Sequence, residues 1–180
     1  MSARERTYRY VGPADLLALV RPERMGAAMR SSAELTAWVE DLPPTELTEP
    51  FTFVVTTDGL LRLAARRSEH VVCAGGQLVL AAGEMTFVAE PSSGRWSVVE
   101  VTNQSTGYCP DPASWTAVAA ALDRAGIEHP GGWTHEVAFR RCEACQERSI
   151  VREDDYVCVF CGAQLPRRWN VDPDAAGQLP

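Results

Sequence analysis

The chain has 180 residues, of which 46% are hydrophobic and 23% are charged, a composition typical of a folded protein with one ordinary domain and a small appendage. Its formal net charge of −7 argues against broad binding to a phosphate backbone. All 17 basic residues are arginine, which is typical of a GC-rich, actinobacterial genome and excludes both a Walker-type phosphate loop and lysine-dependent catalysis.

The first nine residues are polar and charged, without the apolar core of a signal peptide. No stretch of the chain reaches the roughly 18 apolar residues of a membrane-spanning helix. We therefore expect a cytoplasmic protein in which Cys73 and Cys109 are free thiols.

Residues 1–50 are expected to form a helical segment packed on the core. Residues 13–20 predict a short helix, because a proline at its start suits the first helical turn. Residues 31–34 read Ser-Ser-Ala-Glu, a capping box that predicts a second helix ending near Glu40. The prolines at 43–44 stop that helix.

Residues 51–138 are expected to form an α+β core with a mainly antiparallel sheet and one helix. Apolar and polar residues alternate along 51–56, and the Asp58-Gly59 turn predicts a hairpin. The further predicted strands are 60–64, 77–81, 85–90, 95–102 and 133–140. The helix is expected to begin after a cap at Asp111 and to end before Gly126.

Four cysteines form two Cys-x-x-Cys pairs separated by twelve residues, Cys142 with Cys145 and Cys158 with Cys161. Two thiolates in one tight turn can face a single ion, and a second such turn completes a tetrahedron. We expect one structural Zn²⁺, because a catalytic zinc keeps an open position. Paired disulfides, a redox pair and an iron–sulfur cluster fit the compartment, the repetition and the spacing less well.

Residues 139–166 resemble a zinc ribbon of the Cys₄ type, and the run from Cys161 to Pro166 is similar to its second knuckle. The resemblance implies a fold and a metal but no substrate. Residues 146–152 and 156–157 are expected to form the arms of a hairpin, and the sheet of the core is expected to continue into the ribbon. Residues 167–180 are predicted to be a flexible tail.

A second group of candidates lies between residues 68 and 110, at the ends of predicted strands, where sites are often built. The candidate catalytic residues are His70, Glu84 and Tyr108, and the candidate ligand-binding residues are Asn103 and Ser105. Each also has an ordinary structural interpretation, such as a strand-end histidine, a turn carboxylate or a core tyrosine. Cys109, before a proline near a helix start, is either a nucleophile or a small buried residue.

The same stretch resembles a pattern of uncharacterised bacterial proteins, in which a histidine, Gly-Gly, Val and Ala-Gly-Glu precede Asn-x-Ser-Gly-His-Tyr-x-Pro. The chain matches most of these positions, but Thr106-Gly107 stands where Gly-His is usual, so the histidine of that last motif is missing. The resemblance implies a shared site and no particular reaction.

Three functions follow from these patterns. The first is a zinc-ribbon accessory module that binds a protein or nucleotide partner. The second is a small enzyme or a nucleotide- or anion-binding protein, with acid–base groups at His70 and Glu84 and a ligand held by residues 103–108. The third, nucleic-acid binding through the ribbon, is weakened because residues 133–169 contain six arginines and six acidic residues. An enzyme requires its candidates to share one pocket, whereas an interaction module requires an exposed apolar patch near the ribbon.

Overall fold

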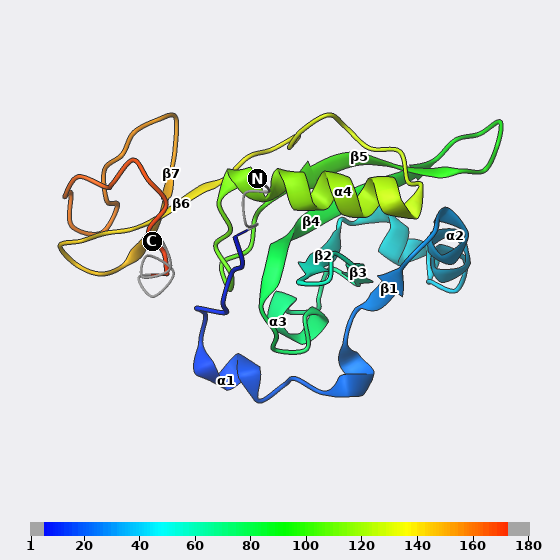
Figure 1. The fold of residues 1–180 in the computed structure, drawn as a ribbon, viewed down its shortest axis with the longest axis horizontal. Coiled ribbons are helices and arrows are strands. Elements are labelled where there is room, and N and C mark those ends of the chain that lie inside the picture. The colour runs from blue at the N-terminus through cyan, green and yellow to red at the C-terminus, as the bar shows by residue number, and fades with distance from the viewer. Residues whose placement is uncertain (1–5, 173–180) are drawn as a thin grey trace.

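The computed structural model describes residues 6–172. An antiparallel sheet of five strands, in the order β1-β3-β2-β4-β5, forms the centre of the molecule (Figure 1). Its strands are β1 (Ala27–Met29), β2 (Phe51–Thr56), β3 (Leu61–Ala64), β4 (Val79–Ala89) and β5 (Trp96–Thr102). The predicted α+β class with a mainly antiparallel sheet is therefore confirmed.

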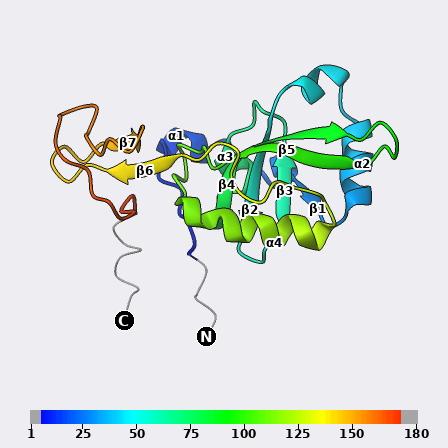
Figure 2. The same cartoon turned by 90° about the horizontal axis from the view of Figure 1, so that it is seen from above.

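The helices are short apart from two. They are α1 (Ala14–Leu17), α2 (Ser32–Glu40), α3 (His70–Cys73) and α4 (Trp115–Ala125), with 3₁₀ turns η1 (Pro22–Arg24), η2 (Pro44–Thr48) and η3 (Pro112–Ser114). Figure 2 shows α4 running along the sheet. No helix among residues 6–172 is long and apolar enough to cross a membrane.

The central strands of the sheet are buried on both faces, and their side chains alternate between two apolar clusters. Phe53 of β2 packs with α2 and α4 on one face, and Val54 packs with α3 on the other. Ser31 caps α2 by accepting a hydrogen bond from the Glu34 N–H at 3.1 Å. Gly126 ends α4 in a left-handed conformation with φ of 67°. The predicted boundaries of α2 and the predicted end of α4 are confirmed, whereas the helix expected directly after Asp111 begins as η3 and is an α-helix only from Trp115.

Several predicted elements of the core differ from the structure. The helix expected at 13–20 is the single turn α1 followed by η1, and β1 and α3 were not predicted. The strands expected at 77–81 and 85–90 are one continuous strand, β4. It passes through Gly83 without a break. A Cβ at this position would collide with the carbonyl oxygen of Thr102 on β5. Gly83 is therefore needed for close strand packing and does not mark a turn.

The ribbon has its own two-stranded sheet, in which β6 (Ala138–Arg141) pairs with β7 (Arg148–Val151). The expectation that the core sheet continues into the ribbon was wrong, since the predicted strand 133–140 is regular only from Ala138. The predicted pairing of 146–152 with 156–157 was also wrong. The first knuckle is itself the hairpin turn between β6 and β7, and Val157 bridges to Gln164 instead.

The ribbon stands at one end of the molecule and is joined to the core by a small apolar cluster (Figure 1). Cys109 of the core packs there with Phe139 of β6, and Trp169 donates its indole N–H to the Cys109 carbonyl at 2.8 Å. Val171 is also buried in this cluster. Trp169 and Val171 thus pack against the core, contrary to the predicted flexible tail, whose residues 173–180 lie outside the described part of the chain.

Candidate functional site

The four ribbon cysteines come together in space. Their sulfur atoms all lie within 4.8 Å of one another, and the Cys142–Cys161 and Cys145–Cys158 distances are both 3.6 Å. These distances are far longer than a disulfide bond of about 2.05 Å. A tetrahedron with Zn–S bonds of about 2.3 Å places its sulfurs about 3.8 Å apart. The four thiols therefore form a cluster compatible with one bound metal ion.

Both Cys-x-x-Cys turns use the same backbone geometry. In each, the first cysteine donates its N–H to the residue five positions later and accepts a hydrogen bond from the N–H four positions later, with N···O distances of 2.8–2.9 Å. The residue four positions later has a positive φ, 65° at Gln146 and 74° at Gly162. The two knuckles thus aim their sulfurs at one point by a repeated fold, although only the second has the glycine that this conformation favours.

The cluster lies across the boundary between the ribbon interior and solvent. Cys142 and Cys158 are buried, whereas Cys161 is exposed. Burial raises the pKa of the Cys158 thiol, but hydrogen bonds from the Ser149 hydroxyl and from nearby backbone N–H groups outweigh it and bring the pKa to about 6. Ser149 therefore stabilises the thiolate form, which is the form that binds metal.

Large apolar side chains protrude from the second knuckle. Val159 and Phe160, which lie between two of the cysteines, are 70% and 63% exposed, and the neighbouring Val157 is also exposed. Single exposed apolar residues are common on protein surfaces, but an adjacent group of them is typical of an interaction site. The apolar patch expected of an interaction module is therefore present beside the cysteine cluster.

Three of the five candidates from residues 68–110 line one cleft of about 220 Å³, namely His70, Glu84 and Ser105. The other two lie elsewhere. Tyr108 is buried and donates its hydroxyl to the Gln77 carbonyl at 2.9 Å, and burial raises its pKa. Asn103 is also buried, with its amide bonded to backbone groups. The structure thus brings together part of the predicted site, and Asn103 and Tyr108 make hydrogen bonds within the fold.

The His70 ring has a defined proton arrangement. Its Nε2 lies 2.9 Å from the carbonyl oxygen of Gly83. Because a carbonyl only accepts, Nε2 carries the proton and the lone pair is on Nδ1. Burial lowers the pKa of His70, and the hydrogen bond to Gly83 opposes that shift only in part. The imidazole is consequently neutral near pH 7 and available as an acceptor.

Other predicted chemistry is not supported by the geometry. Burial raises the pKa of Cys109 to about 12, and its thiol lies 3.3 Å from the Thr106 carbonyl, so it is a protonated packing residue rather than an activated nucleophile.

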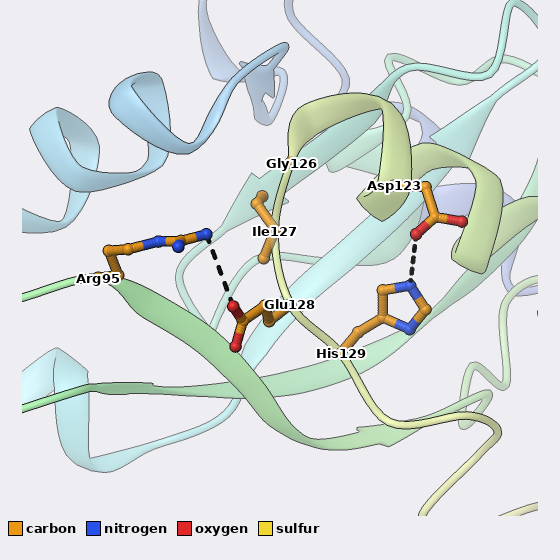
Figure 3. A pocket seen from close by; sticks show the side chains of 6 residues that line it. All are labelled: Arg95, Asp123, Gly126, Ile127, Glu128 and His129. Carbon is orange, nitrogen blue, oxygen red and sulfur yellow. Dashed lines mark hydrogen bonds and ion pairs between the residues drawn. The ribbon is translucent and has the colours of Figure 1, made fainter. Parts of the chain in front are cut away.

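A shallow hollow of about 520 Å³ lies at the end of α4 (Figure 3). Its charged side chains are paired with one another. Arg95 lies 3.6 Å from Glu128, and His129 lies 3.2 Å from Asp123. The charged side chains of the hollow therefore already have partners within the protein.

Sequence reasoning did not find all residues of the cleft or of the patch. Thr52 lines the cleft because it lies directly opposite Glu84 across β2 and β4, a pairing that the sequence alone does not specify. The exposure of Val159 and Phe160 could have been predicted from the sequence, since apolar residues between two cysteines of one knuckle have no core to pack into.

Comparisons with protein families, curated proteins and solved structures found no match to this chain, so the resemblance of residues 68–110 has no support from a relative.

Proposed function

We propose that this chain is a zinc-binding accessory protein whose ribbon, residues 139–166, holds one structural Zn²⁺ and binds a protein partner. The cluster of four thiols, whose sulfur atoms lie within 4.8 Å of one another, carries the proposal. Four cysteine ligands saturate the ion and leave no open position, so the metal stabilises the fold and performs no chemistry. The ribbon depends on the metal for its stability, because the buried residues of its own cluster are Cys142, Cys158 and Leu165, which form a very small apolar core.

The apolar patch of Val157, Val159 and Phe160 is the proposed contact with the partner. Val159 and Phe160 lie between Cys158 and Cys161, so a metal bound by both cysteines sets their position. A protein is favoured over a nucleic acid because the patch is apolar and the ribbon has balanced charge. The acidic turn at 153–155 adjoins the patch in the chain, which favours a partner with an apolar pocket and a basic rim.

Metal analysis of the full-length protein tests the zinc site. We expect one zinc per chain, and we expect Cys142→Ser to lose the ion and to collapse the dispersed NMR signals of the ribbon while those of the core sheet remain. The matched control is Cys73→Ser, which removes a thiol of the core and should keep the zinc. A wild-type ribbon that stays fully folded without metal would overturn the proposal, since the ion should supply much of its folding free energy.

Site-specific photo-crosslinking in cells tests the partner. A crosslinker at position 160 should capture one protein that a crosslinker at the exposed Val99 of β5 does not capture. The purified partner should bind the zinc-loaded chain, and Phe160→Ser should weaken its affinity by at least about tenfold while zinc is retained. Crosslinks only between copies of this chain, or unchanged affinity of Phe160→Ser, would refute a partner protein at this patch.

A further inference from the structure

The cleft at His70 lies at the edge of α3, where this helix no longer covers the sheet. On the α3 face, Val54 and Ala82 are a buried apolar pair across β2 and β4. Two residues farther along each strand, the same face carries Thr52 opposite Glu84. The sheet surface beneath the cleft thus changes from apolar to polar beside Gly83, whose carbonyl oxygen is hydrogen-bonded to His70, the first residue of α3.

Several polar groups of this cleft have no protein partner. Within residues 6–172, the Glu84 carboxylate makes no hydrogen bond or ion pair, and the buried Ser105 hydroxyl is also unsatisfied. His70 uses only Nε2, so its Nδ1 lone pair adds another free acceptor. Buried polar groups are normally hydrogen-bonded, and exceptions tend to occur at functional sites. The unsatisfied Ser105 is therefore an observation, independent of the cavity, that indicates a ligand.

The charges of the lining residues indicate the kind of ligand. All ten are polar or charged, which disfavours an apolar molecule: Thr52, Arg66, Arg67, Ser68, Glu69, His70, Glu84, Gln104, Ser105 and Thr106. Arg66, Arg67 and Glu69 are exposed, so the rim carries two arginines and one carboxylate, and Arg66 also lies 3.3 Å from Glu49. Glu84 and His70 are more enclosed and supply acceptors. The cleft therefore suits a donor group on its floor and an anionic group at its rim.

We propose that this cleft binds a small molecule that carries both an amino group and an anionic group. The amino group is bound by Glu84 and Ser105, and the anionic group by Arg66 and Arg67. The cleft volume of about 220 Å³ is below the range of about 300 to 1,000 Å³ common for drug-sized ligands, so a ligand as large as a mononucleotide would extend beyond the open side of the cleft. A free amino acid and an amino-bearing mononucleotide share the required chemistry. This site is separate from the ribbon and does not depend on the proposed zinc function.

Titration of the zinc-loaded, isotope-labelled chain tests the proposal by NMR. One arm uses free L-amino acids, and the other uses AMP, CMP and GMP. Saturable chemical-shift changes of the backbone amides of Glu84 and Ser105 in either arm support the site, and the arm in which they occur identifies the class of ligand. UMP, which lacks the exocyclic amine, and inorganic phosphate should bind at least about tenfold more weakly than the best ligand. No saturable shift in either arm, or equal binding of phosphate, would overturn the proposal.

Variants separate ligand recognition from folding. Glu84→Gln and Ser105→Ala should each weaken binding of the best ligand by at least about tenfold without lowering the melting temperature, because neither group has a protein partner to lose. Glu100→Gln makes the same charge change on an exposed position of β5 and should bind like the wild type. Wild-type affinity in Glu84→Gln would refute the assigned role of that carboxylate.

Discussion

The side chain of Asn103 pairs with both backbone groups of Val137. Its Nδ2 donates to the Val137 carbonyl at 2.7 Å, and its Oδ1 accepts from the Val137 N–H at 2.7 Å. The same Nδ2 also donates to the Pro110 carbonyl at 3.1 Å. The amide thus substitutes for a neighbouring strand at the point where the chain leaves the core and enters β6. Asn103 is consequently a link between the end of β5 and the ribbon.

We expect Asn103→Asp to destabilise the protein by about 3 kcal/mol, because a carboxylate cannot donate to the two buried carbonyls and repels both. Denaturant unfolding followed by fluorescence measures the loss. Gln104→Glu makes the same amide-to-carboxylate change at the exposed neighbouring position and should change stability by less than about 0.5 kcal/mol. Equal effects of the two substitutions would contradict the link.

The repeated knuckle geometry predicts opposite effects at its two left-handed positions. Gly162→Ala should weaken zinc binding about fivefold, because a non-glycine residue there costs about 1 kcal/mol and folding of the ribbon is coupled to the metal. Nothing lies within 4 Å of a Cβ built at Gly162, so the cost is conformational and not steric. Gln146→Gly should bind zinc at least as tightly as the wild type. Competition with a chelator of known affinity compares the three proteins.

The lowered pKa of His70 predicts a specific loss of stability in mild acid. The unfolded chain takes up the His70 proton near its ordinary pKa of about 6.5, whereas the folded chain does so only at lower pH. The unfolded state therefore binds more protons in this window, and stability falls as the pH drops below about 6.5. His70→Gln should remove this component of the pH dependence of the unfolding free energy.

The control for that measurement is His135→Gln, because His135 is an exposed histidine outside the cleft. Protonation of the zinc ligands also weakens the protein in acid, but it affects all three proteins alike and cancels in the comparison. A His70→Gln profile that parallels the wild type between pH 7.5 and 5.5 would contradict a buried neutral imidazole.

Thiol counting separates the ribbon from the core. Cys73 and Cys109 are buried, and burial raises the pKa of each to about 12, so neither should react with a disulfide reagent in the native protein. Addition of a strong chelator should release the four clustered cysteines for rapid reaction. The remaining two should react only after denaturant unfolds the core. Six fast thiols after chelation alone would show that the metal holds the core together as well.

Local patterns in the chain were sufficient to predict some features. The two Cys-x-x-Cys pairs identified the cluster, because a tight turn sets the direction of both of its sulfurs without help from distant residues. The serine cap of α2 and the glycine after α4 marked helix ends for the same reason. The alternation along residues 51–56 predicted β2, and the polar composition of 68–110 pointed to His70, Glu84 and Ser105.

Only the tertiary structure decided which of these residues meet. Asn103 resembled a ligand-binding residue in the sequence, but the long-range approach of Val137 makes it a structural link. The floor of the cleft depends on the register that sets Thr52 opposite Glu84, and strand register is a property of the whole sheet. The pairing of β7 with β6 likewise depends on the first knuckle closing as a hairpin. The sequence by itself thus determined the cysteine cluster and the fold class, whereas the cleft and the link at Asn103 follow from contacts between distant segments.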